Sequence, residues 1–382
     1  MASTTSVPEK VIQLRKHLHQ HPELSGEEKR TADTLREFLK EAEPTDLITG
    51  LGGHGLAAIF DSGEPGPVVL LRADMDALPI AEKNTFSYRS AYDNIAHLCG
   101  HDGHSAIMAG VALQLKASPP KQGKVVLLFQ PAEETGEGAE IVINDPAFQS
   151  IHPDYAFALH NLPGFEKGVI FVREESFAFA STGIIMHLTG QTAHAANPEN
   201  GNNPDMAMAQ LITGINNLSK EQHLFSDFAL ATVIHARLGD VAFGTTPGKG
   251  VVMATLRTAI DSDMETLKNH VVEMARNISK ERNLELDISY REPFPATINH
   301  PECVEIIEKG AAQASLTVET LEDPFRWSED FGHFTRISKA ALFGIGAGTN
   351  HPQLHTGNYD FPDEIIAPAI QTFCQIIKNI TQ

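Results

Sequence analysis

The sequence contains little cysteine. Only Cys99, Cys303 and Cys374 occur among its 382 residues. An odd and sparse set of thiols argues against a disulfide framework and favours a reducing compartment. The N-terminal segment lacks the apolar core of a secretory signal peptide, and no apolar run approaches the roughly 20 residues that cross a bilayer. We therefore expect a cytoplasmic protein with no membrane partner.

Basic residues are also scarce. Lys and Arg number 29 against 49 Asp and Glu, so the formal net charge is -20. A surface of this sign repels the phosphates of nucleic acids and the headgroups of anionic lipids, so neither is an expected partner.

The length, by contrast, is ample. Because one domain typically has roughly 100–200 residues, the chain is expected to form two or three.

The first part of the chain alternates apolar runs with helical patterns. Strands are predicted at 55–60, 68–76, 124–131 and 155–162, and helices at 8–23, 26–42 and 105–118. This alternation predicts an α/β fold, with a mixed, mostly parallel sheet and helices on both faces. In such sheets ligands gather beyond the carboxyl ends of the strands. The helix at 26–42 follows the letters SGEE, in which Ser25 and Glu28 are expected to form a capping box.

A different pattern occupies residues 180–293. Its elements follow the order βαββαβ, which is the ferredoxin-like arrangement. We therefore predict one domain made of residues 1–179 and 294–382. Residues 180–293 would form a compact α+β domain inserted into it.

Metal-capable side chains are concentrated in one short stretch. The letters HLCGHDGHS at 97–105 place Cys99 and His101 on either side of a glycine that permits a tight bend. Thiolate and imidazole together suit zinc and tolerate manganese, cobalt or nickel. By itself this pair also fits a buried thiol beside a histidine at a helix start, because short motifs match often by accident.

Similar groups follow other predicted strands. These groups are the acid pair Glu133–Glu134, His160, His355, and Asp74 with Asp76. Each has a structural alternative, such as a solvated acidic loop for the glutamates. Adjacent carboxylates repel each other unless a cation intervenes. Because all these groups lie beyond strand ends of one predicted sheet, we expect them to form a metal site.

Five motifs in order resemble those of a known family. They are LLRADMDALPI, CGHDGHSAIMAG, FQPAEETGEGA, FALHNLP and LHTGNYDFPDE. Over nearly the whole chain the sequence resembles peptidase family M20, the aminoacylase and carboxypeptidase family of two-metal hydrolases. It is most similar to the amidohydrolase subfamily, which includes hippurate hydrolases, auxin-conjugate hydrolases and N-acetyl amino acid deacetylases.

The resemblance implies a role for each candidate residue. Two divalent ions per subunit, of zinc, manganese, nickel or cobalt, would be held by Cys99, His101, Glu134, His160 and His355, with Cys99 as the bridge. Glu133 would act as general base and acid, and Asp76 would orient a ligand. The resemblance also makes 1–179 and 294–382 a metal-dependent catalytic domain and 180–293 a lid and dimerisation domain. His194 of this lid would reach an active site, commonly that of a partner subunit, which implies a homodimer through the lid.

Three positions bear on substrate recognition. Gly244 stands where the family has a substrate-binding asparagine, and Trp327 where it prefers glycine. Arg257, in a family-like LRT, is a candidate to bind an anion.

The resemblance implies metal-dependent hydrolysis of the amide bond of N-acyl amino acids or similar small amides. The alternatives are a dipeptidase or carboxypeptidase acting on a peptide-like substrate, a metal-binding homologue without catalysis, and a hydrolase that uses Cys99 as nucleophile.

Overall fold

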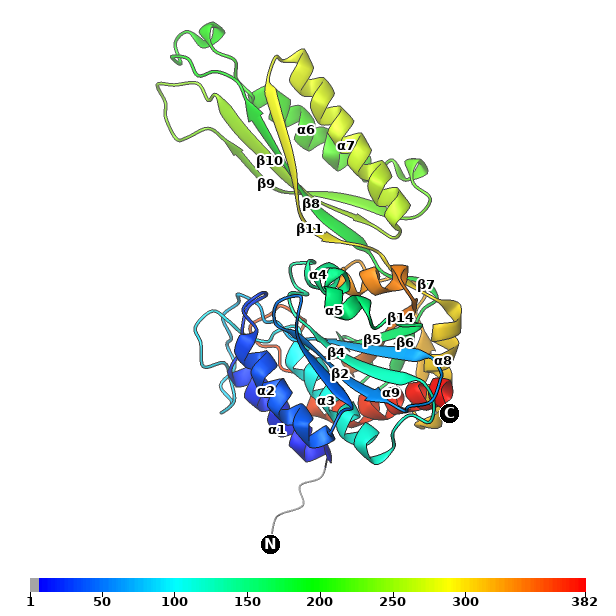
Figure 1. Cartoon of the computed structure of the whole chain (residues 1–382). Helices are drawn as coiled ribbons and strands as arrows, with labels where there is room; N and C mark the ends of the chain where they lie inside the picture. Colours follow the sequence, from blue (N-terminus) through cyan, green and yellow to red (C-terminus); the bar gives the residue numbers. More distant parts are fainter. Residues whose placement is uncertain (1–6) are drawn as a thin grey trace. The chain divides into compact units, whose positions relative to one another are not determined.

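The chain folds into two compact units, described here by a computed structural model of residues 7–382 (Figure 1). The first unit contains the described residues up to Phe177 together with Thr297–Pro324 and Asp330–Gln382. The second contains Ala178–Ala296 and also Phe325–Glu329. The predicted inserted domain, 180–293, lies within this second unit, and the short segment 325–329 is an addition to it.

An eight-stranded sheet forms the centre of the first unit, in the order β1-β2-β4-β3-β5-β14-β6-β13. The pairs β3–β4, β3–β5, β5–β14 and β6–β13 are parallel, and β1–β2, β2–β4 and β6–β14 are antiparallel. This confirms the predicted mixed, mostly parallel sheet. The strands are β1 (Asp46–Leu51), β2 (Gly55–Asp61), β3 (Val68–Asp74), β4 (Lys124–Gln130), β5 (Tyr155–Pro163), β6 (Ile170–Val172), β13 (Val318–Thr320) and β14 (Lys339–Gly348). A two-stranded sheet pairs β7 (Glu175–Ala178) with β12 (Thr297–Asn299).

Helices cover both faces of this sheet, as predicted (Figure 1). One layer contains α1 (Val7–Gln20), α2 (Lys29–Leu39), α3 (His101–Ala117), α8 (Pro301–Gln313) and α9 (Ile366–Thr381). The opposite layer contains α4 (Gly138–Asn144), α5 (Pro146–Gln149) and the 3-10 segment η4 (Asp330–Arg336). Burial of apolar side chains such as Ile107, Phe129 and Phe373 between the layers drives this packing. Within residues 7–382, no helix has both the length and the apolar character to span a membrane.

The start of α2 differs from the prediction. The helix begins at Lys29, and its N-cap residue Glu28 makes no side-chain cap bond within the described part of the chain. Ser25 instead donates from Oγ to Oδ2 of Asp76 at 2.7 Å. The Glu28 carboxylate accepts from the backbone N–H of Gly26 and of Ala132, both at 2.8 Å. The predicted capping box is therefore wrong, because both side chains are engaged by other segments.

The second unit has the predicted βαββαβ order. Its elements are β8 (Ala180–Thr189), α6 (Asp205–Leu218), β9 (Ala229–Leu238), β10 (Lys249–Thr258), α7 (Asp261–Glu281) and β11 (Glu285–Phe294). The sheet is antiparallel in the order β11-β8-β10-β9, and both helices pack against it. Ile184, Leu211, Val252 and Val271 form part of its separate core. Alternation of buried and half-buried residues along β10 reflects this one-sided cover.

Candidate active site

The predicted ligands come from segments at one edge of the large sheet. Glu133 and Glu134 follow β4, His160 lies in the second half of β5, and His355 follows β14. Because β3, β4, β5 and β14 are parallel neighbours, their carboxyl ends point the same way. The chain therefore carries these residues to a common place.

Cys99 and His101 reach that place from the start of α3. Gly100 between them has a φ of 106°, and a Cβ there would lie 2.4 Å from Oδ1 of Asn161. Only glycine adopts this backbone without strain, and the contact leaves no room for a side chain. The turn directs the side chains on both sides of it into the cluster.

The sulfur of Cys99 contacts two histidines. It is 3.6 Å from Nε2 of His160 and 3.4 Å from Nε2 of His355. Potential ligand atoms of Cys99, His101 and His160 lie within 4.8 Å of one another, as do those of Cys99, Glu134 and His355. Cys99 thus belongs to two neighbouring three-residue groups.

A third group joins His101 to both glutamates. Nε2 of His101 lies 3.8 Å from Oε2 of Glu133 and 3.8 Å from Oε1 of Glu134. Among the described residues, Nε2 of His101 and Oε1 of Glu134 are buried and have no hydrogen-bond partner. Leaving such atoms unsatisfied costs about 1–3 kcal/mol each. Unpaired imidazole and carboxylate atoms beside a thiol match the donor set that divalent transition metals take, so these residues fit a metal centre.

Burial opposes charge throughout this cluster. It raises the pKa of the Cys99 thiol well above its usual value, and the Glu134 carboxylate adds to the effect. It likewise raises the pKa of Glu134 to about 8 and lowers that of His160 to about 3. A bound cation favours the deprotonated thiol, carboxylate and imidazole, which are the forms that ligate metals.

Asp76 bonds two residues of the cluster, His101 and Glu134. Nδ1 of His101 lies 2.9 Å from the backbone oxygen of Asp76 and 3.1 Å from its Oδ1. The other carboxylate oxygen accepts from the Ser25 hydroxyl and from the backbone N–H of Glu134 at 3.0 Å. These bonds leave Nε2 of His101 facing the cluster.

A buried polar group lies beside the ligands, and two of its members, Asn161 and Tyr359, were not predicted from the sequence. His104 makes contacts of 2.7 Å to Oδ1 of Asp74 and 2.6 Å to Oδ1 of Asn161. Asn161 also donates to the Tyr359 hydroxyl at 2.6 Å. Asp74 was a candidate from its place after a predicted strand. The only signal for Asn161 was its position next to His160, and nothing in the sequence linked Tyr359 to this group.

Asp74 is tied to a buried arginine. Arg72 donates to Oδ2 of Asp74 at 2.7 Å and to Oδ1 of Asp330 at 2.6 Å. Asp330 also bonds Gln130, and its backbone N–H donates to Oε1 of Glu133 at 3.4 Å. Glu133 is thus held by the same network as Asp74.

The remaining candidates belong to the second unit. His194 is exposed there, and its Nδ1 accepts from the backbone N–H of Ala196 at 3.0 Å. Gly244 lies in an open loop that pairs with the His194 loop. Arg257 donates to the backbone oxygen of Arg326 and to Ser328, and Trp327 stacks on Phe325. The role of His194 therefore stays a prediction.

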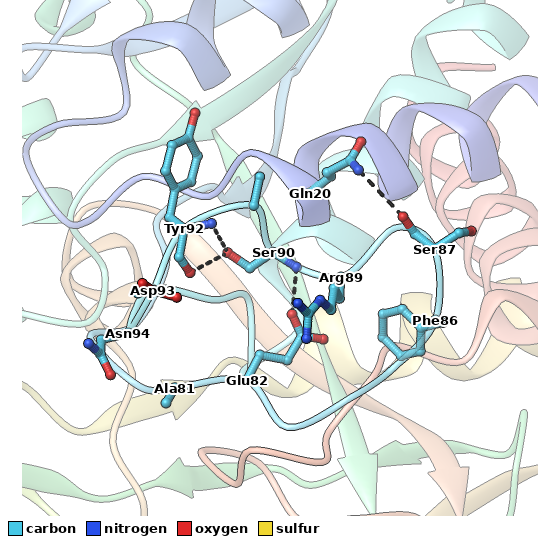
Figure 2. Close-up of a pocket in the computed structure, with 11 residues that line it drawn as sticks. Gln20, Ala81, Glu82, Phe86, Ser87, Arg89, Ser90, Tyr92, Asp93 and Asn94 are labelled. Atoms are coloured by element: carbon cyan, nitrogen blue, oxygen red, sulfur yellow. Dashed lines mark hydrogen bonds between the residues drawn. The ribbon is translucent and has the colours of Figure 1, made fainter.

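The first unit also contains a cavity of about 550 Å³ (Figure 2). Gln20 and residues between Ala81 and Asn94 line it, and none of the predicted ligands is among the described residues of its wall. Some of its polar groups bond one another. Figure 2 shows the Ser90 N–H donating to Glu82 and the Gln20 amide donating to the Ser87 carbonyl. We therefore do not place the reaction here.

Comparison with known proteins extends the likeness over both units. The model of Peptidase family M20/M25/M40 matches residues 70–379. An uncharacterized hydrolase of Staphylococcus aureus (strain bovine RF122 / ET3-1) is 30% identical over 381 residues, which cover 97% of each protein. A crystal structure from methicillin-resistant Staphylococcus aureus, provisionally called an aminohydrolase, has a TM-score of 0.89 and 25% identity, and covers 98% of this chain and 97% of that one. The Bacillus subtilis YXEP protein, a dinuclear metal binding peptidase from the M20 family, shares the fold with a TM-score of 0.84, 24% identity and 98% coverage of both chains.

Proposed function

The chain belongs to peptidase family M20/M25/M40, and on that premise we propose that it is a metal-dependent amidohydrolase that cleaves the amide bond of N-acyl amino acids or similar small amides. One observation carries the proposal. The sulfur of Cys99 lies 3.6 Å from Nε2 of His160 and 3.4 Å from Nε2 of His355, and two adjacent glutamates face His101 in the same cluster.

The residues that would hold the ions divide into two sets. Cys99 with His101 and His160 would hold one divalent ion, and Cys99 with Glu134 and His355 the second. Zinc, manganese, cobalt and nickel all suit these donors. When bound, such ions polarise a carbonyl and make water more acidic, which are the two demands of amide hydrolysis.

Glu133 is the group that we assign to proton transfer. It takes a proton from the attacking water as the oxygen bonds to the carbonyl carbon. It then passes this proton to the nitrogen as the C–N bond breaks, so a carboxylic acid and an amine leave. Glu133 is nearly buried, and its oxygens face Nε2 of His101 and the backbone N–H of Asp330, so its position is restrained.

Three further residues are assigned supporting roles. Asp76 holds His101 by its Nδ1 and would thereby present Nε2 to a bound ion. His194 would donate to the oxyanion that develops on the carbonyl oxygen. Arg257 would bind the carboxylate of an amino acid product or substrate. The residue is half-buried, and the bonds described for its guanidinium within residues 7–382 go to no carboxylate.

We also propose a homodimer formed through the second unit, in the cytoplasm. Strand β9 is an edge of its sheet, and Val241 and Phe243, which follow it, are 100% and 99% exposed. An edge strand flanked by exposed apolar side chains is suited to pairing with another chain. The three free cysteines fit a reducing compartment.

A substrate panel tests the activity. Protein reconstituted with each metal would be given acetyl- and benzoyl-amino acids alongside dipeptides, and the released amine measured. We expect hydrolysis of the acyl amino acids in preference to the dipeptides. Preference for dipeptides would support a peptidase, and stoichiometric metal with no hydrolysis of either class would support a non-catalytic homologue.

A further inference from the structure

The loop between α1 and α2 carries one buried carboxylate, that of Glu28, which bonds the backbone next to Glu133 and Glu134. Glu28 is fully buried, and its Oε1 accepts from the backbone N–H of Ala132 at 2.8 Å. It also accepts from Gly26 at the same distance, within its own loop. One oxygen therefore joins residues 26 and 132, which are far apart in the chain.

Ala132 has an unusual backbone and directly precedes Glu133. Its φ is 55°, in the left-handed region that residues other than glycine seldom adopt. Its carbonyl accepts from Gly138 at 3.1 Å and from the Thr135 hydroxyl at 3.2 Å. With Glu28 on the N–H, both polar groups of this residue are bonded. A left-handed residue persists only when surrounding contacts hold it.

A second contact from the same loop acts on the other side of Glu133. Ser25 donates to Oδ2 of Asp76, and this oxygen also accepts the backbone N–H of Glu134. Glu28 thus restrains the chain just before Glu133, and Ser25 restrains the carboxylate that bonds the chain just after it.

Helix formation does not account for these side chains. The N-cap of α2 makes no side-chain cap bond in the described structure, although Ser25 and Glu28 have the residue types for a capping box. Oε2 of Glu28 is buried with no partner among residues 7–382, and burial raises the pKa of Glu28 to about 7. A buried carboxylate with one unsatisfied oxygen is unfavourable for stability alone.

We propose that Glu28 is a positioning residue that sets the backbone of the Glu133–Glu134 pair through Ala132, with Ser25 assisting through Asp76. The catalytic consequence rests on the function proposed above, whereas the effect on backbone and metal affinity does not. An outer residue that orients metal ligands typically contributes about 10–100-fold in metal affinity or activity.

The test compares Glu28→Leu with Glu28→Gln, because glutamine retains the acceptor oxygen and leucine does not. The exposed neighbour Glu27→Leu is the matched control. In the metal-free protein, we expect Glu28→Leu to speed hydrogen exchange in a peptide covering residues 130–136, and Glu28→Gln and Glu27→Leu to leave it unchanged. Zinc titrated against a chelator should bind about tenfold more weakly to Glu28→Leu. With an acyl amino acid as substrate, the kcat of Glu28→Leu should fall about tenfold or more below that of the wild type, with little change in KM. The kcat of Glu28→Gln should stay within about threefold of the wild type.

The proposal is overturned if Glu28→Leu matches the wild type in hydrogen exchange at residues 130–136 and in zinc affinity. It is also overturned if Glu28→Gln changes these measurements as much as Glu28→Leu does. Should Glu28→Leu fail to fold, Ser25→Ala provides the second comparison, with weaker zinc binding expected and unchanged binding contradicting the proposal. If the wild type hydrolyses no acyl amino acid, the proposed function fails, while exchange and zinc affinity still decide the role of Glu28.

Discussion

The sulfur of Cys99 lies 3.4 Å from Nε2 of His355, although 256 positions separate the two residues in the chain. The contact joins the start of α3 to the loop after β14, and the backbone N–H of His355 also donates to the Leu98 carbonyl at 2.8 Å. His355 itself has a φ of 61°, so this loop holds a non-glycine residue in the left-handed region at the cluster. Local strain at this position is consistent with a functional constraint.

Replacing Cys99 tests whether one thiol serves both ligand sets. We expect Cys99→Ser to lower metal content from two ions per chain to one or fewer, because both groups share this sulfur. Turnover should fall by about a hundredfold or more, in line with the loss of metal-based activation. The matched control is Cys374→Ser, a half-buried thiol in α9. Elemental analysis after dialysis gives the metal content, and two retained ions in Cys99→Ser would rule out the bridge.

Glu133→Gln separates proton transfer from metal binding. The amide keeps the shape of the side chain but cannot accept the proton, so kcat should fall by about 10²–10⁴-fold while metal content stays unchanged. Glu140→Gln, an exposed acid in the same region, should behave as the wild type. Activity retained by Glu133→Gln would remove this residue from the mechanism.

Metal removal distinguishes the proposed mechanism from one that uses Cys99 as nucleophile. Dialysis against a chelator should abolish hydrolysis, and added zinc, manganese, cobalt or nickel should restore it, because the cluster supplies donors that suit these ions. Unfolding should also occur at a lower temperature without metal, since a ligand that binds only the folded state stabilises it. Alkylation does not discriminate, because a bridging thiol also reacts. Activity that survives complete metal removal would favour the nucleophile.

The buried pair His19–Asp102 predicts a pH dependence of stability. Nδ1 of His19 lies 2.9 Å from Oδ2 of Asp102, and Nε2 lies 3.1 Å from Oε1 of Glu82. Burial alone lowers the pKa of His19, but Asp102 and Glu82 outweigh it and raise the pKa to about 9. Because the folded pKa exceeds the unfolded one, the stabilisation is full below about pH 6.5 and is lost as the pH rises through about 9.

The size of this effect follows from the shift in pKa, and amounts to about 3 kcal/mol. We expect the difference in free energy of unfolding between wild type and His19→Gln to shrink by about that amount from pH 6 to pH 10. Denaturant titrations across this range measure it, with the exposed His223→Gln as control. A difference that stays constant with pH would show that His19 is not charged in the fold.

His194 and the edge of the second unit can be tested together. His194→Ala should lower kcat by about a hundredfold, the usual loss of one oxyanion donor. Phe243→Asp should convert a dimer into a species with the 41.5 kDa mass of one chain, measured by light scattering. If His194 acts on the partner's site, mixed dimers of His194→Ala and Glu133→Gln should regain activity. A wild type of 41.5 kDa would contradict the dimer.

Much of the architecture was readable from the sequence because burial leaves a local pattern. The continuous apolar runs of β3, β4 and β5 predicted strands covered on both faces, and the βαββαβ order predicted the second unit. The three-residue strands β6 and β13 were not anticipated, since so short a run carries no periodicity of its own.

The sequence by itself determined which residue types could form a site, since motifs placed thiol, imidazole and carboxylate groups after predicted strands. Only the tertiary structure decided which of them meet. Parallel pairing brings β5 beside β14 and carries both His160 and His355 to within contact of one sulfur, and no local pattern encodes that pairing. The same reason explains Ser25 and Glu28. Their spacing is that of a helix cap, but long-range packing places Asp76 and Ala132 within reach, and these partners satisfy the side chains instead.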